Sequence, residues 1–424
     1  MRIYVSSLGC KLNQSEMDTL AARMAQGGHQ VVASPAEADL CVLNTCAVTH
    51  VAAQKSRQAL RRLHRENPQA RLVATGCYAE LTPTDLVDLP GVESVVGNQE
   101  KARLWETLGG GAPIQQPLSQ VPRSRTRALV KIQDGCDNAC SYCIIHIARG
   151  PQQSVSQEDI LTEVRARLAA GHQEIVLTGV HIGAYGRDSG TDAGGDLWDL
   201  VPRILAETGV PRLRLSSIEP WDLPEHAFRL WHDARLCRHL HLPLQSGSDA
   251  ILRRMARRYT TAEFAALVSA ARAAIPDLAV TTDVIVGFPG ETEQEFAQSL
   301  AFVEASGFAR THVFPYSLRP GTPAARMSDQ VPSQVKAARA KAMRDVAAGS
   351  HRAFRQRFVG RTMDVLWESC REGQPGAKYR GLTGNYLRVE TAAAGGLANT
   401  LTATHLTELS EQGLWGIPKI KNGG

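Results

Sequence analysis

Residues 134–143 read DGCDNACSYC and place Cys136, Cys140 and Cys143 within eight residues. The segment directly before them, ALVKIQ at 128–133, is mostly apolar and predicts a β-strand that ends where the cysteine loop begins. Three thiols are one fewer than a closed tetrahedral metal site contains. The stretch therefore predicts a metal centre with three protein ligands, carried by a loop at the end of a strand.

Strands and helices alternate after this loop. Further strands are predicted at 174–180, 212–218, 239–244, 279–288 and 311–317, and helices at about 156–170, 196–208, 248–273, 292–305 and 333–357. Repeated βα units build parallel sheets, and six of them indicate part of a barrel. The predicted fold class is α/β, with a central partial (β/α)6 barrel.

The first hundred residues also alternate between strands and helices. Strands are predicted at RIYVSSL, DLCVLNT and RLVATG, and helices at 15–26, 51–65 and 83–89. Cys10, Cys46 and Cys77 each follow one of these strands. Because the carboxyl ends of parallel strands meet at one edge of a sheet, we expect a parallel α/β domain with three thiols at that edge.

Two changes in composition divide the chain. The segment 109–124, GGGAPIQQPLSQVPRS, has the composition of a linker. Residues 360–424 hold short β-rich runs separated by glycines, which predict a small C-terminal β-barrel. Since 424 residues exceed a single core, the predicted domains are 1–112, 122–352 and 355–420.

The composition is that of a folded protein, with 43% hydrophobic and 21% charged residues. The chain opens on a strand-like sequence without a signal peptide, and no apolar run is long enough to cross a membrane. We therefore expect a cytoplasmic protein with no membrane partner and reduced cysteines. Basic runs at 55–65, 253–258 and 336–361 suit nucleic-acid phosphates, although solvated helix faces explain such runs equally well.

Three kinds of site compete for the central cysteines. A zinc site prefers two pairs of ligands and would here need His146 as the fourth. Disulfides leave one thiol unpaired and conflict with a reducing compartment. An iron–sulfur cluster takes thiolates as its normal ligands, and three of them would leave one iron open.

The CxxxCxxC loop after the first barrel strand resembles the radical S-adenosylmethionine superfamily. The resemblance implies a [4Fe–4S] cluster on Cys136, Cys140 and Cys143, with S-adenosylmethionine on the open iron as the source of a radical. It also implies cofactor contacts at later motifs. The candidate residues are Tyr142, Thr178, Gly179, Glu219, Gln245, Ser246, Arg257 and Gly287, with Gly290 beside the last.

The motifs GCKLNQ, NTCAV and GCYAE, together with the central loop and the β-rich tail, resemble the methylthiotransferases over essentially the whole chain. The resemblance implies a second [4Fe–4S] cluster on Cys10, Cys46 and Cys77, which holds the sulfur to be inserted. It implies that S-adenosylmethionine serves as both methyl donor and radical source, and that an electron donor protein is required. The C-terminal barrel would be a TRAM-like domain that contacts RNA.

The loop wording QDGCDNACSYCIIHIARG and the motif GCKLNQ resemble the branch that modifies C2 of N6-threonylcarbamoyladenosine 37 in the tRNA anticodon loop. The alternatives are the branches for N6-isopentenyladenosine 37 and for a ribosomal-protein aspartate. An alternative of another class is a non-catalytic iron–sulfur RNA-binding protein. The chain departs from the usual loop at His146, where proline is usual, and at Gln153, where arginine is common. No catalytic acid or base is assigned, although His181, His241 and His312 lie near predicted strand ends.

Overall fold

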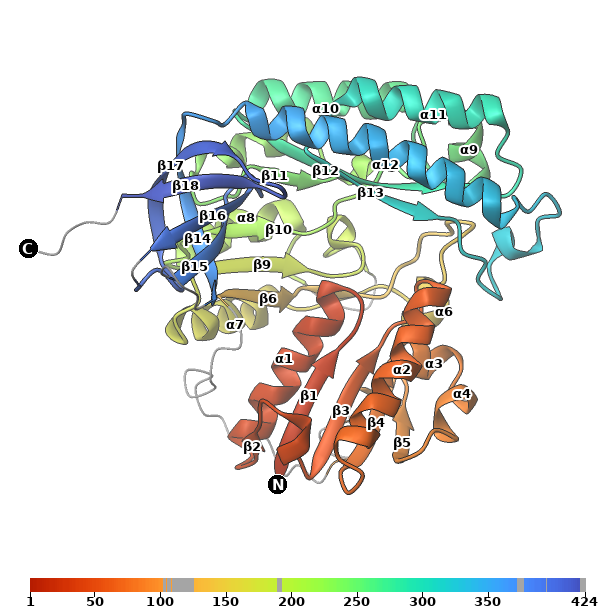
Figure 1. Ribbon diagram of the computed structural model, residues 1–424, viewed down its shortest axis with the longest axis vertical. Coiled ribbons are helices and arrows are strands. Elements are labelled where there is room, and N and C mark those ends of the chain that lie inside the picture. The colour runs from red at the N-terminus through yellow and green to blue at the C-terminus, as the bar shows by residue number, and fades with distance from the viewer. Residues whose placement is uncertain are drawn as a thin grey trace, which may run out of the picture.

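The computed structural model describes residues 1–101, 104, 108, 126–188, 193–371, 377–393 and 395–419. Figure 1 shows three parts: a parallel sheet with its helices at the bottom, a larger α/β core along the top, and a small barrel at the left. The predicted linker at 109–124 and the predicted boundaries at 112 and 122 lie outside the described residues. No helix in the described part of the chain has the length and apolar character needed to span a bilayer.

The N-terminal part is a parallel sheet, as the sequence predicts, but it has five strands rather than three. Its strand order is β2-β1-β3-β4-β5, with β1 (Arg2–Ser7), β2 (Gln30–Val31), β3 (Leu40–Thr45), β4 (Arg71–Gly76) and β5 (Val92–Val96). The strands β2 and β5 are not among the three predicted. The helices are α1 (Lys11–Gln26), α2 (His50–Glu66), α3 (Cys77–Leu81) and α4 (Thr84–Val87). The central strand β3 is buried along its whole length, which explains its continuous apolar run.

The core contains all six predicted barrel strands. They are β6 (Arg127–Lys131), β9 (Glu174–Thr178), β10 (Leu213–Leu215), β11 (His239–His241), β12 (Ala279–Val286) and β13 (Arg310–Pro315). They form two three-stranded parallel sheets, ordered β10-β9-β6 and β11-β12-β13, and a bridge between Ser217 and His241 joins the two. The result is an open, partial barrel whose terminal strands are β6 and β13.

Helices cover the outside of this barrel. They are α7 (Gln157–Ala169), α8 (Leu197–Glu207), α10 (Thr261–Ala274), α11 (Glu293–Ser306) and α12 (Ser333–Gln356). Outward residues of the strands, such as Val130, Ile175 and Leu213, are fully buried against the helices. Because side chains alternate along a strand, neighbours such as Glu174 and Arg214 face the barrel lumen instead.

The prediction of one continuous helix over 248–273 is wrong. The segment 248–273 forms two helices, α9 (Asp249–Arg254) and α10, rather than one. Ala256 between them has a left-handed φ of +57°, which a continuing α-helix does not allow. Thr260 then caps α10 in a capping box with Glu263.

The C-terminal part is the predicted small barrel. Its strands are β14 (Thr362–Arg371), β15 (Ala377–Thr383), β16 (Arg388–Ala393), β17 (Leu401–Leu409) and β18 (Leu414–Pro418), closed in the order β14-β15-β16-β18-β17. Tyr386, between β15 and β16, stacks on His239 of the core with ring centroids 4.6 Å apart. The predicted boundary at 352–355 falls within α12, which runs on to Gln356 and leads into the barrel.

Candidate active site

The three N-terminal cysteines lie at the carboxyl edge of the parallel sheet. Cys10 precedes α1 as its N-cap residue, Cys46 follows β3 directly, and Cys77 follows β4 as the first residue of α3. Gly9 has a φ of +98°, and a Cβ there would lie 2.6 Å from the Cys46 sulfur. This glycine therefore allows the Cys10 loop to come close to Cys46. Cys41, inside β3, packs into the hydrophobic core.

The central cysteines lie on the loop between β7 (Gln133–Asp134) and α6 (Ile145–Arg149). The Cys136 amide donates to the Gly150 carbonyl at 3.2 Å, and the Cys143 amide donates to the Cys140 carbonyl at 3.1 Å. These bonds fold the loop back on itself, so that all three thiols are presented from one short segment.

The donor atoms of each triad suit an iron–sulfur cluster better than a single metal ion. Within the described residues, no three Cys, His, Asp or Glu side chains gather as ligands of a single metal ion would. A [4Fe–4S] cube binds each thiolate through a different iron, so its ligands need not converge on one point. Burial raises the pKa of Cys46 to about 11 and of Cys143 to about 12, so these thiols need added positive charge to ionise, which iron supplies. The donor sets fit such clusters.

Basic side chains flank the central triad. Arg257 donates to the Cys140 sulfur at 3.5 Å, while its guanidinium also pairs with Glu219. His181 bonds to Asp222 at 2.5 Å and lies against Cys136. Although burial opposes protonation, the hydrogen bonds to Asp222 and Cys136 raise the pKa of His181 to about 9. The site thus provides positive charge beside thiolates, whose clusters are anionic.

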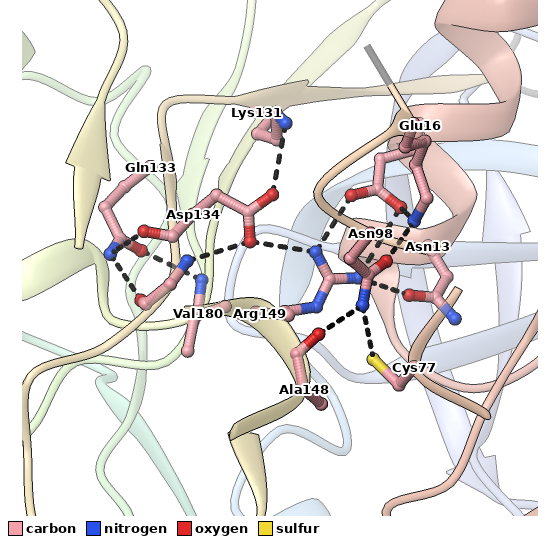
Figure 2. A network of polar contacts seen from close by, with 12 residues as sticks. Asn13, Glu16, Cys77, Asn98, Lys131, Gln133, Asp134, Ala148, Arg149 and Val180 are labelled. Atoms are coloured by element: carbon pink, nitrogen blue, oxygen red, sulfur yellow. Dashed lines mark hydrogen bonds and ion pairs between the residues drawn. The ribbon is translucent and has the colours of Figure 1, made fainter. Parts of the chain in front are cut away.

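Arg149 connects the two cysteine loops (Figure 2). From the last residue of α6, its guanidinium donates to Asn13 at 2.6 Å, to Glu16 at 2.8 Å and to Asp134 at 2.8 Å. Asn98 donates to the Ala148 carbonyl at 2.6 Å and to the Cys77 sulfur at 3.6 Å. The central loop is therefore held directly against the N-terminal cysteine edge.

Glu16 is the buried anion of this network. Lys101 donates to it at 2.6 Å, and the side chains of Arg149 and Glu16 are only 2% and 6% exposed. Burial opposes the charged form, but Arg149 and Lys101 hold the pKa of Glu16 well below its usual value. Sequence reasoning did not find Glu16 or Lys101, because nothing local to either residue indicates a partner.

The predicted cofactor contacts surround the central loop. Thr178 ends β9, and a Cβ on Gly179 would lie 2.8 Å from the Gln133 carbonyl. Gln133 itself accepts from the Val180 amide at 3.0 Å (Figure 2). It also accepts from the His181 amide at 2.8 Å, and the two bonds tie the loops together. Sequence reasoning missed Gln133, whose role depends on a backbone distant in sequence.

Three further candidates, Gln245, Ser246 and Gly287, follow strands of the second sheet. Gln245 has a φ of +64° and bridges to β12, and Ser246 is fully buried beside it. Gly287 has a φ of +69° and donates its amide to Glu291 at 2.6 Å. Tyr142 packs against the cluster that contains Phe288, next to Gly287.

Comparison with known proteins identifies the family. Residues 130–303 match the Radical SAM superfamily, and residues 2–97 match the Uncharacterized protein family UPF0004. The threonylcarbamoyladenosine tRNA methylthiotransferase MtaB of Bacillus subtilis is 37% identical over 402 residues, covering 90% of this chain and 88% of its own. The chain belongs to the radical S-adenosylmethionine methylthiotransferase family. The family uses [4Fe–4S] clusters and S-adenosylmethionine, which confirms the predicted cofactors.

Other relatives agree with this placement. The MtaB protein of Thermotoga maritima is 36% identical, covering 86% of each chain. A tRNA-2-methylthio-N(6)-dimethylallyladenosine synthase of Desulfitobacterium hafniense is 31% identical, covering 98% of this chain and 97% of its own. Among solved structures, the radical S-adenosylmethionine methyltransferase TsrM of Kitasatospora setae superposes with a TM-score of 0.55 at 17% identity, over 76% of this chain and 77% of its own. That likeness confirms the fold alone.

The structure shows the surroundings of His146 and Gln153, the two residues that depart from the usual methylthiotransferase loop. His146 is the second residue of α6, in the first turn, where a helix needs no backbone donor and so also accepts proline. Its Nδ1 atom is buried without a hydrogen-bond partner among the described residues. Gln153 lies in the short strand β8 (Gln153–Ser154), is exposed, and pairs with the Asp134 backbone.

The three candidate histidines have different surroundings. His181 is buried, bonds to Asp222 at 2.5 Å and lies within hydrogen-bond reach of Asn138 at 3.1 Å. His241 pairs with Asp283 at 3.2 Å, and its ring centroid lies 6.0 Å from that of His312. His241 and His312 therefore share the lumen wall of this methylthiotransferase.

The basic runs divide into structural and exposed residues. Arg339 pairs with Glu291 at 2.8 Å, and Arg355 donates to the barrel carbonyls of Ser410 and Gly413, so both are structural. Four arginines on α2 and α12 are exposed and form no ion pair with any residue that the structure describes. They are Arg61, Arg65, Arg344 and Arg352.

Proposed function

We propose that the protein transfers a methylthio group to C2 of N6-threonylcarbamoyladenosine 37, beside the anticodon of tRNA. The observation that carries the proposal is the direct connection between two cysteine triads, made by Arg149 on one side and Asn13 and Glu16 on the other. Relatives named for this activity, at 33–37% identity over most of the chain, support the choice of substrate.

We further propose that Cys10, Cys46 and Cys77 bind the auxiliary cluster, and that Cys136, Cys140 and Cys143 bind the cluster that holds S-adenosylmethionine. When bound, these groups supply the radical and the sulfur. The protein's part is to place them: Arg149 and Asn98 hold the two loops together, while Arg257 and His181 provide positive charge.

The residues proposed to contact S-adenosylmethionine form the edge around the central loop. Glu219 accepts from Arg257, and in the bound state its carboxylate is suited to a ribose hydroxyl. A Cβ on Gly179 would lie 2.8 Å from the Gln133 carbonyl, and a Cβ on Gly287 would lie 2.2 Å from the Lys336 side chain, so both glycines allow segments of the protein itself to pack closely at this edge. The full set is Tyr142, Thr178, Gly179, Glu219, Gln245, Ser246, Arg257 and Gly287.

We propose the anticodon loop of tRNA as the partner, with an electron donor protein supplying electrons in the cytoplasm. The exposed arginines of α2 and α12 provide positive charge for phosphates. The target base has to leave its stack to reach the barrel lumen, as bases in RNA loops can.

Nucleoside mass spectrometry on tRNA from cells that lack the gene tests the substrate. We expect the methylthio group to disappear from N6-threonylcarbamoyladenosine and to return on complementation. Loss from N6-isopentenyladenosine instead would support the second candidate, which the dimethylallyladenosine relative favours. No change in tRNA would point to the ribosomal-protein branch.

Anaerobic incubation of cluster-loaded protein with S-adenosylmethionine and a reductant tests the reaction class. Formation of 5′-deoxyadenosine is the expected result. Its absence would support a non-catalytic iron–sulfur RNA-binding protein and rule out the proposed chemistry.

A further inference from the structure

The electrostatic neighbours of Lys11 indicate that its side chain points toward the lumen of the partial barrel. Lys11 is the first residue of α1, next to Cys10, and is only partly exposed. Its ammonium is within electrostatic reach of one residue on every barrel strand. These are Arg127 of β6, Glu174 of β9, Arg214 of β10, His239 of β11, Asp283 of β12 and His312 of β13. Only a lumen position is close to all six strands at once.

Lys11 reaches the lumen through the open side of the barrel. The terminal strands β6 and β13 are not joined, and α1 packs along β6, where the Ser15 hydroxyl donates to the Leu129 carbonyl at 2.9 Å. The N-terminal domain thereby places a cation from its cysteine edge into the lumen of the core.

The charged residues around Lys11 in the lumen have partners of their own. Arg214 and Arg212 each contact Glu174 at 2.7 Å, and Arg127 pairs with Glu368. Asp283 pairs with His241 at 3.2 Å. Lys11, by contrast, forms no hydrogen bond or ion pair with any residue in the described ranges, which is costly for a cation with little access to water.

We propose that Lys11 is a specificity residue that binds the carboxylate of the threonylcarbamoyl group on the target adenosine. This inference rests on the proposed function. The threonylcarbamoyl substituent ends in a carboxylate, which an unpaired ammonium complements through charge-assisted hydrogen bonds. An isopentenyl substituent is an uncharged hydrocarbon and would leave Lys11 without a partner in the lumen.

The position of Lys11 agrees with the geometry of the reaction. Lys11 directly follows Cys10, so the backbone that carries Lys11 lies at the N-terminal cysteine edge. The N6 substituent and C2 are attached to different carbons of the purine ring. The substituent can therefore extend toward the lumen wall while C2 faces the two cysteine triads.

Stem-loop RNAs with two forms of the modified base test this inference on the cluster-loaded enzyme. One carries N6-threonylcarbamoyladenosine, and the other carries the same group with its carboxylate converted to a neutral amide. We expect the wild type to prefer the carboxylate about 10- to 100-fold in kcat/KM and in binding affinity. Lys11→Gln should reduce that ratio to about one, and Lys11→Arg should largely keep it.

Controls separate the charge effect from damage to the neighbouring cysteine. Iron content and 5′-deoxyadenosine formation report whether Lys11→Gln keeps both clusters. Lys341→Gln, an exposed cation on α12, should change both RNAs by the same factor and leave their ratio unaltered.

The outcomes are distinguishable. If the wild type uses both RNAs equally well, or if Lys11→Gln keeps the preference, Lys11 does not read the carboxylate although the proposed function stands. If the wild type modifies neither RNA, the proposed function is wrong and the inference falls with it. The comparison of the two RNAs on wild-type enzyme needs no variant, so a misfolded Lys11→Gln would not prevent the test.

Discussion

Arg149 donates a hydrogen bond of 2.8 Å to Glu16 and so joins the central cysteine loop to the first helix of the N-terminal domain. Both side chains are almost fully buried, and Asn13 and Lys101 complete their hydrogen bonds. A buried pair of this kind fixes relative position, because either charge is costly when its partner is removed. The two cysteine edges are therefore positioned by one polar network rather than by apolar packing alone.

Arg149→Ala should destabilise the protein by about 3–5 kcal/mol, because it leaves Glu16 buried with only Lys101 as a cation. Urea unfolding under anaerobic conditions measures the change. Lys341→Ala removes an exposed pair with Asp345 and should cost no more than about 0.5 kcal/mol. Equal effects of the two variants would contradict the bridging role of Arg149.

Cys46→Ala should leave the protein with one cluster instead of two, and so with about half of its iron. Cys41→Ala is the matched control, since Cys41 lies in the adjoining strand, is fully buried and packs in the core. Iron analysis of reconstituted protein should find two clusters in the control. Retention of both clusters by Cys46→Ala would show that Cys46 is not a ligand.

His351 should make stability depend on pH. Burial, helped by Arg355, lowers the pKa of His351 to about 4 in the folded protein. The contribution of neutral His351 to the free energy of unfolding is therefore fully present above the unfolded-state pKa of about 6.5. It is lost as the pH falls from there toward 4, because the unfolded chain then binds a proton that the folded protein does not. Because the ring is partly exposed, the expected loss between pH 7 and pH 5 is about 1 kcal/mol.

Thermal unfolding at the two pH values measures this dependence. His351→Gln should have a shallower pH profile than the wild type. The exposed His226→Gln serves as control and should keep the wild-type profile. An unchanged slope in His351→Gln would assign the dependence to other groups.

Arg344→Gln and Arg352→Gln should weaken tRNA binding, and each should lower its salt dependence by about one released ion, because each removes one of the cations proposed to contact the tRNA phosphates. Both arginines are exposed on α12. Affinity measured from low to moderate salt gives the slope. Arg165→Gln, on α7 and paired with Glu207, is the control that should keep the wild-type slope.

The long elements of the fold could be predicted because their patterns are local. The apolar run of β3 and the β-branched residues of β12 identify strands without knowledge of any partner. Short strands escaped prediction: β2 has two residues and β5 has five, so each depends on pairing with a neighbour rather than on its own pattern. The break at Ala256 also escaped, because a left-handed alanine has no signal in sequence.

The sequence by itself determined the two cysteine triads and the parallel strands that carry them, because cysteine spacing and strand periodicity are properties of neighbouring residues. Only the tertiary structure decided that Arg149 meets Glu16, and that Lys11 enters a lumen built by six strands. Those relationships join residues more than a hundred positions apart. They arise from the burial of charges, whose partners are set by the folded arrangement and not by their sequence neighbours.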